Sequence, residues 1–463
     1  MSSAIGLIGL GTMGKALARN IASKGFKVSV WNRTPEKITD FVLRYGNEFI
    51  HGAENFEAFV ESMDRPRKVI LMLPDGAPTE EILKRLAPAL DEGDCVMDGA
   101  NALFRLTELH QKQLLDRGVH FLGTGVSGGE EGALHGPSLM PGGSHEAWQV
   151  FEPILMAIAA EDFTGKACAA YMGGGGAGHY VKMVHNGIEY AEMQTLAEAY
   201  DLLREAYKLS NAEIADIVEG WTTGPLESYL MDIAVEVLRK EEDGHSLLDL
   251  ILDKAGQKGT GTWTSQEALS LGVPTPSLTG AVFARSLSAD KETRTRLSSQ
   301  LKAAKTAPGF TLADFTAHLE KAIFLARIAH FTQGFALLQA AETEHHYGFP
   351  LEEVARVWQG GCIIRSSMLT PIRAHFAANK TLLYESPFAV DAILQNTQSL
   401  RAVVATAATQ GVPLFALSGA LSHIEAYRRA ELPANLIQGL RDRFGAHGYE
   451  RKDQPGPFHS EWQ

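Results

Sequence analysis

The stretch Ile5-Gly-Leu-Ile-Gly-Leu-Gly-Thr-Met-Gly14 decides the fold of the first part of the chain. A short apolar strand pattern runs into Gly9-x-Gly11-x-x-Gly14, and a helical pattern over 15–24 follows at once. In this order the first glycine permits a tight turn, the second lets the backbone approach a pyrophosphate, and the third lets helix and strand pack closely. A purely structural glycine turn is the alternative. Strand, motif and helix in sequence favour a dinucleotide whose phosphates sit on the helix start.

The end of the second apolar run favours NADP over NAD. NAD enzymes usually place Asp or Glu about 20 residues after the glycines, where it binds the ribose hydroxyls. This chain has Asn32-Arg33-Thr34 there instead, with Lys37 nearby. A guanidinium can pair bidentately with a 2′-phosphate, and Asn and Thr can add hydrogen bonds. A surface arginine in a turn is the alternative, but the missing acid favours phosphate binding.

The chain changes character twice along its length. Apolar runs alternate with helical patterns from residue 4 to about 125, which predicts an α/β Rossmann domain with a mostly parallel, doubly wound sheet. Helical patterns alone fill roughly 178–430. We therefore predict a dinucleotide-binding domain at 1–176, a large all-α domain at 177–431 and a C-terminal tail at 432–463. The tail has so little core of its own that it must dock on another surface or be disordered.

The helical part contains a candidate internal duplication. Residues 207–220 align without a gap with residues 347–360. A long helical pattern precedes each copy, at Tyr180–Ala206 and Leu319–Glu344. Two copies of one helical unit is the natural interpretation. Chance similarity between amphipathic helices is the alternative.

Composition excludes several classes of protein. The 463 residues are 45% hydrophobic and 21% charged, as in an ordinary globular protein. The net charge of −13 argues against a nucleic-acid binder, although locally placed cations can still bind an anionic substrate. Cys95, Cys168 and Cys362 are too few and too far apart to predict disulfides or a metal site. No secretory signal and no apolar run of about 20 residues is visible, so we expect a cytoplasmic protein without a membrane span.

The segment Tyr180-Val-Lys-Met-Val-His-Asn-Gly-Ile-Glu-Tyr190 predicts a buried helix with one polar stripe. The stripe holds four residues, at i, i+3, i+4 and i+7: Lys182, His185, Asn186 and Glu189. Burial lowers the pKa of a lysine, so Lys182 is a candidate general base, and Glu189 is a candidate general acid. The alternative is the solvated face of an ordinary helix, with Lys182 and Glu189 too far apart in sequence to pair directly.

Other segments carry candidate binding groups. Gly125-Val-Ser-Gly-Gly129 follows an apolar strand that ends at Leu122, near the sheet edge where such folds bind ligands, and its backbone N–H groups could hold a carboxylate. A simple turn is the alternative. Lys258 lies in a glycine-rich loop that suits a phosphate, and a mobile exposed loop is an equal alternative. Spacing alone does not place three further cations, Arg285, Arg441 and His447.

Together these segments resemble the decarboxylating 6-phosphogluconate dehydrogenases over nearly the whole chain. No single stretch is decisive, but all of them occur in order, at 130–143, 178–190, 255–261, 281–286 and 441–449. The resemblance implies a Rossmann domain joined to a duplicated helical domain. It also implies a homodimer in which the C-terminal tail reaches into the active site of the partner subunit.

The resemblance implies roles for individual residues, with Lys182 as the general base and Glu189 as the general acid. The implied substrate ligands are Asn101, Ser127, Gly128, Gly129, His185, Asn186, Tyr190, Lys258 and Arg285, with Arg441 and His447 arriving from the other subunit. The implied ligands of NADP are Gly9, Leu10, Gly11, Thr12, Met13, Gly14, Asn32, Arg33, Thr34, Leu73, Pro74, Asp75 and Asn101.

The implied reaction is the oxidative decarboxylation of 6-phosphogluconate to ribulose 5-phosphate and CO₂, with reduction of NADP, as in the oxidative pentose phosphate pathway. Lys182 takes the proton of the C3 hydroxyl as hydride leaves for the nicotinamide. The β-keto acid then loses CO₂, and the protonated lysine stabilises the enolate oxygen. Glu189 finally supplies a proton to C1 of the enediol, which gives ribulose 5-phosphate. No metal is required.

The chain departs from the family pattern mainly near the cofactor. It has Asp98-Gly-Ala-Asn-Ala102 where Asp-Gly-Gly-Asn-Ser is usual, and Leu73-Pro-Asp-Gly76 where Val-Lys-Ala-Gly is usual. The lost lysine weakens the electrostatic support for NADP and leaves room for dual use of NAD. Arg443 also stands where an aromatic residue is common. Because these changes lie mainly near the expected cofactor site, they do not alter the substrate that the resemblance implies.

Two alternative functions stay open. The first is a dehydrogenase of another β-hydroxy acid, but such enzymes are usually shorter and lack the arginine and histidine of the tail. The second is a non-catalytic protein that senses NADPH. A binding module needs neither Lys182 nor Glu189, so their presence argues against it.

Overall fold

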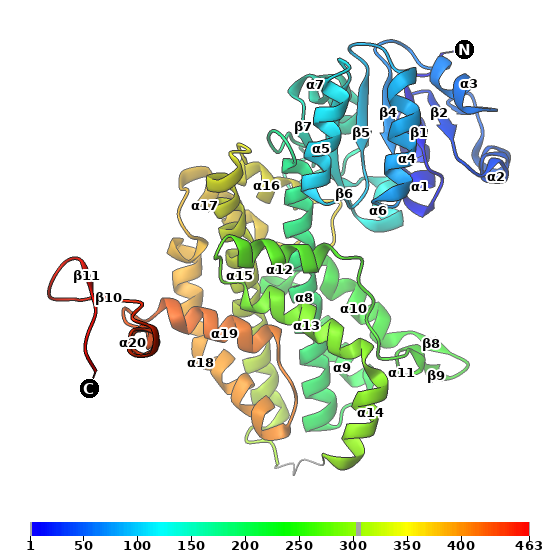
Figure 1. Cartoon of the computed structure of the whole chain (residues 1–463). Helices are drawn as coiled ribbons and strands as arrows, with labels where there is room; N and C mark the ends of the chain where they lie inside the picture. The colour runs from blue at the N-terminus through cyan, green and yellow to red at the C-terminus, as the bar shows by residue number, and fades with distance from the viewer. Residues whose placement is uncertain (1, 302–306, 463) are drawn as a thin grey trace.

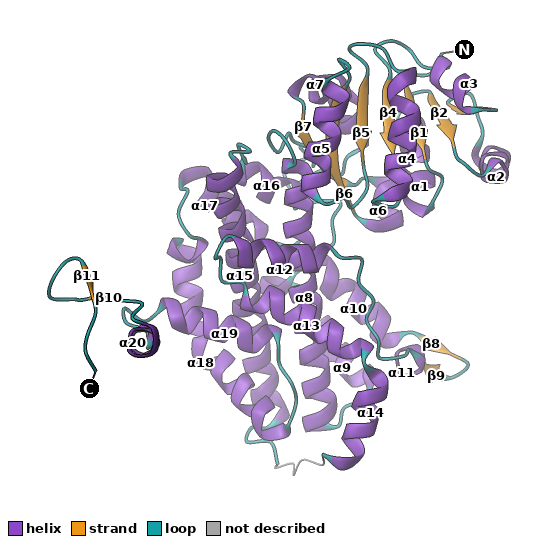
Figure 2. Cartoon of the chain, in the orientation of Figure 1, coloured by secondary structure: helices purple, strands orange, loops and turns teal. Residues whose placement is uncertain are grey.

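The computed structural model describes residues 2–301 and 307–462 and divides into two parts of different secondary structure (Figure 1, Figure 2). The first part is a sheet with helices on both faces, and the second is almost entirely helical. In the described residues, no helix is both long enough and apolar enough to cross a membrane.

Seven strands form the sheet, in the order β3-β2-β1-β4-β5-β6-β7. All neighbours are parallel except β6 and β7, which confirms the predicted mostly parallel, doubly wound sheet. Because the strand order reverses between β1 and β4, ligands are expected at the carboxyl ends of these strands. The strands are β1 Ile5–Ile8, β2 Val28–Trp31, β3 Ile50–Gly52, β4 Lys68–Leu71, β5 Cys95–Asp98, β6 His120–Ser127 and β7 Ser138–Gly143.

The strand residues are apolar because both faces of the sheet are covered. Ile5, Val28 and Val69 are completely buried, as expected for strands between two helical layers. The helices of this part are α1 Thr12–Ser23, α2 Pro35–Tyr45, α3 Phe56–Glu61, α4 Ala77–Leu86, η1 Ala87–Ala89, α5 Phe104–Leu115, α6 Gly129–His135 and α7 His145–Ile158.

Three features of the sheet differ from the sequence expectation. The strand predicted to end at Leu122 continues to Ser127, so Gly125 and Ser127 belong to β6 rather than to a loop after it. Antiparallel pairing with β7 causes this extension, because it supplies hydrogen-bond partners beyond the parallel ladder. β3 and β7 were not predicted, since β3 has three residues and β7 contains Pro141-Gly-Gly143, which is unusual in a strand.

The second part is built around two long helices, α8 and α15, that pack on each other. Its described elements are α8 Ala177–Tyr207, α9 Asn211–Glu219, η2 Gly224–Leu226, α10 Tyr229–Arg239, β8 Glu241–Glu242, β9 His245–Ser246, α11 Leu247–Leu250, α12 Thr260–Ser270, α13 Pro276–Ala289, α14 Lys291–Gln300, α15 Leu312–His345, α16 Leu351–Val357, α17 Leu369–Ala378, η3 Leu383–Glu385, α18 Pro387–Gln410 and α19 Ala416–Tyr427.

The two aligned segments have the same local structure. Each follows the end of a long helix, and the aligned residues Lys208 and Gly348 both have positive φ, 58° and 81°. The next helices, α9 and α16, begin at the aligned positions Asn211 and Leu351. This agreement in turn and helix start supports the duplication over chance similarity.

The tail lies apart from the rest of the chain, at the red end of the ribbon in Figure 1. It consists of one helix and a small antiparallel hairpin, α20 Ala434–Gly445, β10 Tyr449–Glu450 and β11 Pro457–Phe458. Arg441 lies within this helix.

Candidate active site

Glycines bring helix α8 against the edge strands of the sheet. A Cβ atom on Gly178 would lie 2.1 Å from the carbonyl oxygen of Gly123 in β6. A Cβ atom on Gly125 would lie 2.4 Å from Cβ of Lys182. No other residue type fits at such distances without a backbone shift, so these glycines permit the contact that places Lys182 beside β6.

Lys182 lies at the centre of a buried polar group on α8 and β6. Lys182 is only 6% exposed, and its Nζ donates a hydrogen bond of 3.0 Å to Oγ of Ser127. Nζ also lies 3.4 Å from Nδ1 of His185, whose Nε2 is 3.3 Å from the same Ser127 Oγ. The three side chains therefore form a closed triangle.

The polar stripe of α8 continues from this triangle toward the solvent. Nδ1 of His185 lies 3.1 Å from Oδ1 of Asn186 and 3.6 Å from Oε2 of Glu189. The Glu189 side chain keeps 21% exposure, whereas that of His185 is completely buried. We name the set Ser127, Lys182, His185, Asn186 and Glu189 the Lys182 cluster.

Burial shifts the pKa values of the two proton-transfer candidates toward their neutral forms. Desolvation lowers the pKa of Lys182, with opposition from the negative charge of Glu189 and from Cys362. Desolvation raises the pKa of Glu189, with opposition from the cations Lys182 and Arg285. Desolvation and the charge of Lys182 hold the pKa of His185 well below its usual value. A neutral lysine and a protonated glutamic acid are the forms that a base and an acid need.

Helices α12 and α13 bring the predicted cation Arg285 onto the same face of α8. The guanidinium carbon of Arg285 lies 3.4 Å from the centre of the Tyr190 ring, and Nη1 donates to the carbonyl of Gly256 at 3.2 Å. The ring of Tyr190 packs closely against Gly261, where an added Cβ atom would lie only 2.5 Å from the ring. Lys258 lies exposed in the loop just before α12.

Two loops at the carboxyl edge of the sheet adjoin the cluster. Gly128 and Gly129 follow Ser127 with φ of 109° and 65°, and a Cβ atom on Gly128 would lie 2.6 Å from the carbonyl oxygen of Gly361. After β5, Oδ1 of the buried Asp98 accepts a 2.9 Å hydrogen bond from the backbone of Ala100. This turn leaves Asn101 exposed next in sequence.

The glycine motif has the shape that a bound dinucleotide requires. Gly9 has φ of 107°, and a Cβ atom on Gly14 would lie 1.9 Å from the carbonyl oxygen of Gly9. A Cβ atom on Gly11 would meet nothing within 4 Å, so space is open on this side of the turn. No side chain caps the first turn of α1, which begins at Thr12, so its N–H groups are free for a pyrophosphate. These residues fit NADP.

The residues predicted to bind the 2′-phosphate differ in their contacts. Oδ1 of Asn32 accepts a 3.0 Å hydrogen bond from the backbone of Leu10, so Asn32 holds the glycine turn in place. The Arg33 side chain is 75% exposed and forms a 3.4 Å ion pair with Glu81 of α4. Arg33 is therefore a solvent-accessible cation after β2. Pro74 and Asp75 follow β4 on the neighbouring edge, where the carbonyl of Pro74 accepts from Thr79 Oγ1 at 3.0 Å.

The two predicted residues of the tail are not near the Lys182 cluster in a single chain. Arg441 and His447 are both exposed on α20 and the turn after it, and the tail stands away from the helical part in Figure 1. Within one chain, contacts join Ser127, Lys182, His185, Asn186 and Glu189 in the cluster, and Arg285 packs on Tyr190 of the same helix, whereas Arg441 and His447 lie outside it.

The segment after α16 contributes residues that sequence reasoning missed. The ring of Trp358 meets the ring of His185 edge to face, with centres 5.7 Å apart, and its Nε1 donates to Sδ of Met140 at 3.4 Å. Gly361 lies under Gly128, and Cys362 acts on the pKa of Lys182. In the sequence, this segment is marked only by the second copy of the repeat, which ends at Gly360. The repeat does not indicate that the segment lies close to α8.

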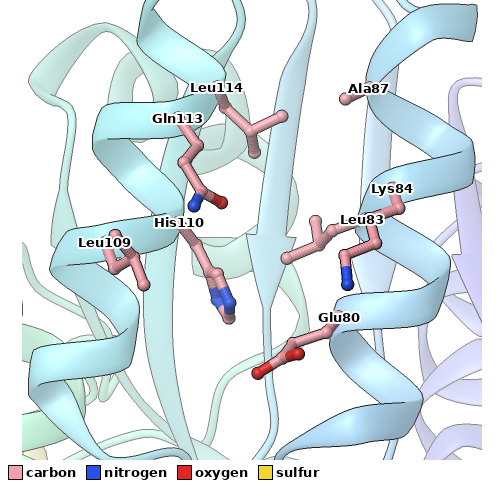
Figure 3. Close-up of a pocket in the computed structure, with 8 residues that line it drawn as sticks. All are labelled: Glu80, Leu83, Lys84, Ala87, Leu109, His110, Gln113 and Leu114. Atoms are coloured by element: carbon pink, nitrogen blue, oxygen red, sulfur yellow. The ribbon is translucent and has the colours of Figure 1, made fainter.

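A groove between α4 and α5 is separate from the Lys182 cluster (Figure 3). It is lined by Glu80, Leu83, Lys84, Ala87, Leu109, His110, Gln113 and Leu114, none of which is a predicted site residue. Residues 2–301 and 307–462 contain no group of three or more His, Cys, Asp or Glu side chains that could hold a metal ion.

Comparisons with known proteins cover the whole chain. The model of the NAD binding domain of 6-phosphogluconate dehydrogenase matches residues 4–173, and that of the C-terminal domain of 6-phosphogluconate dehydrogenase matches residues 178–462. The NADP(+)-dependent, decarboxylating 6-phosphogluconate dehydrogenase of Bacillus subtilis is 46% identical over 465 residues, which are 99% of this chain and 98% of that protein. The decarboxylating 6-phosphogluconate dehydrogenase of Escherichia coli is 44% identical over 461 residues, with the same coverage of 99% and 98%.

A solved structure extends this similarity to three dimensions. Plasmodium falciparum 6-phosphogluconate dehydrogenase, described in its apo form and in complexes with NADP⁺ and with 6-phosphogluconate, superposes with a TM-score of 0.95 at 38% identity. The match covers 99% of this chain and 100% of that one.

Proposed function

This chain belongs to the 6-phosphogluconate dehydrogenase family and catalyses the NADP-dependent oxidative decarboxylation of 6-phosphogluconate. We propose that Lys182 and Glu189 perform the two proton transfers of this reaction. The observation that carries this assignment is the Lys182 cluster, in which Nζ of buried Lys182 lies 3.0 Å from Oγ of Ser127 and Glu189 lies farther along the same stripe of α8. Burial lowers the pKa of Lys182 and raises the pKa of Glu189, in keeping with these roles. The products are ribulose 5-phosphate and CO₂.

The proton transfers balance within the site. Neutral Lys182 accepts the proton of the C3 hydroxyl, and Ser127 holds Nζ at 3.0 Å for this task. Bound NADP supplies the hydride acceptor for the oxidation at C3. The β-keto acid then loses CO₂, while protonated Lys182 stabilises the negative charge on the C3 oxygen. Protonated Glu189 delivers a proton to C1 of the resulting enediol, the carbon that was C2 of 6-phosphogluconate. After one turnover Lys182 is protonated, because it took a proton from oxygen, and Glu189 is ionised, because it gave a proton to carbon. The return of one proton from Lys182 to Glu189 restores the starting forms.

The substrate is held by polar and cationic groups around this stripe. A phosphate and a carboxylate each call for charge-assisted hydrogen bonds, which lysine, arginine and backbone N–H groups supply. The proposed ligands from one chain are Asn101, Ser127, Gly128, Gly129, His185, Asn186, Tyr190, Lys258 and Arg285. The packing of Arg285 on Tyr190 supports including both.

NADP is held along the carboxyl edge of the sheet. The open side of Gly11 and the uncapped start of α1 support pyrophosphate binding there. The exposed Arg33 is the proposed partner of the 2′-phosphate. The full proposed set is Gly9, Leu10, Gly11, Thr12, Met13, Gly14, Asn32, Arg33, Thr34, Leu73, Pro74, Asp75 and Asn101.

The active enzyme is a homodimer in which Arg441 and His447 enter the partner's site. The exposed apolar face of α20, formed by Leu436, Ile437, Leu440 and Phe444, supports docking of the tail on another surface. The proposed domains remain 1–176, 177–431 and 432–463. The start of α8 at Ala177 supports the first boundary. A cytoplasmic location is proposed too, and the three free, buried cysteines are in keeping with it.

The deciding experiment measures initial rates of NADP and NAD reduction with 6-phosphogluconate for wild type, Lys182→Ala and the exposed-lysine control Lys112→Ala. We expect NADP-linked turnover with CO₂ release, lost by a factor on the order of 10³ in Lys182→Ala and unchanged in the control. Full activity of Lys182→Ala would remove the lysine from the mechanism. An inactive wild type with both cofactors would refute the substrate.

A further inference from the structure

The tail contains one acidic side chain that is buried although its surroundings are exposed. Asp442 is 1% exposed, while its neighbours Arg441 and Arg443 on α20 are exposed. Four donors meet its carboxylate. Oδ1 accepts from the backbone of Gly448 at 3.0 Å and from Nδ1 of His459 at 2.8 Å, and Oδ2 accepts from the backbone of Ser460 at 3.1 Å and from Nε1 of Trp462 at 2.8 Å.

These hydrogen bonds fix the backbone on both sides of His447. Ahead of it, the N–H of Ala446 donates to the backbone carbonyl of Asp442 at 2.9 Å, and Ala446 has a left-handed φ of 51°. After it, the N–H of Gly448 donates to the Asp442 carboxylate. A turn with a non-glycine residue at positive φ persists only where its surroundings hold it. Asp442 supplies the side-chain part of that support.

Arg441 is linked to the same turn through a glutamine. Nη1 of Arg441 donates to Oε1 of Gln438 at 3.0 Å, and Nε2 of Gln438 donates to the carbonyl oxygen of Gly448 at 2.6 Å. Gly448 is therefore held at its N–H by Asp442 and at its carbonyl by Gln438. Gly448 thus links the turn that carries His447 to the part of α20 that carries Arg441.

The last strand of the chain closes the arrangement. β11 pairs with β10, with Phe458 opposite Tyr449, and this brings the next residues back to Asp442. Burial raises the pKa of Asp442, but the hydrogen bonds from His459, Trp462, Ser460 and Gly448 outweigh it and hold the pKa well below its usual value. The carboxylate is thus ionised when it accepts all four bonds.

We propose that Asp442 is a positioning residue, which holds Arg441 and His447 in a fixed relative arrangement so that the tail delivers them together to the substrate of the partner subunit. This inference rests on the proposed exchange of the tail. It adds that the pair is prepared within the tail itself, before any contact with the partner. Preparing two ligands in advance lowers the entropy that substrate binding must otherwise overcome.

The test uses the full chain and the variant Asp442→Asn, which keeps the shape but replaces one accepting oxygen by an NH₂ group that cannot accept. Its matched control is Asp453→Asn, an exposed acid of the same tail that pairs with Arg451. KM for 6-phosphogluconate, KM for NADP and the sedimentation coefficient are measured for both, and for Arg441→Ala. We expect Asp442→Asn to raise KM for 6-phosphogluconate at least tenfold, with KM for NADP within twofold and the dimer intact. Asp453→Asn is expected to match wild type.

A combined variant separates positioning from a general loss of tail structure. Added to Arg441→Ala/His447→Ala, the Asp442→Asn change is expected to raise KM no further, because the groups it positions are gone. A further rise, or an equal rise in KM for NADP, would overturn the positioning role. An unchanged KM in Asp442→Asn beside a raised KM in Arg441→Ala would overturn it while leaving the tail exchange standing. An unchanged KM in Arg441→Ala would overturn the proposed tail function itself.

Discussion

The two halves of the site are built in opposite ways. On the catalytic half, Ser127, Lys182 and His185 are buried and bonded to one another before any ligand arrives. On the cofactor half, Arg33 is three-quarters exposed, and its ion pair is with an exposed glutamate. A buried charge interacts strongly and shifts in pKa, whereas an exposed pair is screened by water and salt. The catalytic half is therefore fixed by buried contacts, whereas the cofactor half depends on backbone shape and on Arg33, an exposed cation in a surface ion pair.

The comparison predicts the largest effects in the catalytic half, beginning with Glu189→Gln. This variant loses the proton donated to C1, so kcat is expected to fall by about 10² to 10⁴. In wild type, activity declines at low pH as Lys182 gains a proton and at high pH as Glu189 loses one. The raised pKa of Glu189 and the lowered pKa of Lys182 widen the range between the two limits.

A pH profile of kcat/KM checks the assignment independently of the rate. In Glu189→Gln the alkaline decline should vanish, since the group that loses a proton there is absent, while the acid decline from Lys182 should remain. An alkaline decline that persists unchanged in the variant would show that another group causes it.

The next effect tests whether close packing fixes the catalytic lysine. In Gly125→Ala the new methyl group would stand 2.4 Å from Cβ of Lys182, so α8 or β6 must shift. A displacement on the order of 1 Å can cost about 10² in rate, and we expect kcat to fall by about that factor with KM for NADP unchanged. Gly174→Ala is the control, because a methyl group there meets nothing within 4 Å. Equal activity of the two variants would contradict the packing argument.

The smallest effects should come from the exposed half. Arg33→Ala removes the proposed 2′-phosphate partner, so KM for NADP is expected to rise about tenfold, with KM for NAD and kcat unchanged. Glu81→Gln, which releases Arg33 from its ion pair, should lower KM for NADP by about twofold to threefold. Initial rates with each cofactor at fixed 6-phosphogluconate measure both. A parallel change in KM for NAD would mean that Arg33 does not read the phosphate.

Sequence reasoning succeeded where a feature is local. The glycine motif, the strand before it and the helix after it are neighbours in sequence, and each glycine has the conformation or close contact that the motif requires. The stripe on α8 was equally accessible, because helical spacing alone places Lys182, His185 and Glu189 on one face. The length of β6 was missed, since its last residues depend on pairing with β7.

By itself, the sequence determined the alternation of strands and helices that indicates the Rossmann fold, the dinucleotide motif, the polar stripe of the catalytic helix and the resemblance to one enzyme family. Only the tertiary structure decided which side chains meet. It placed Ser127 on Lys182, Trp358 on His185 and Arg285 on Tyr190, and it used Asn32 to hold the glycine turn. The physical reason is that periodicity and local conformation act over a few residues. Burial, and the pKa shifts that come with it, depend instead on contacts between segments that lie far apart in the chain.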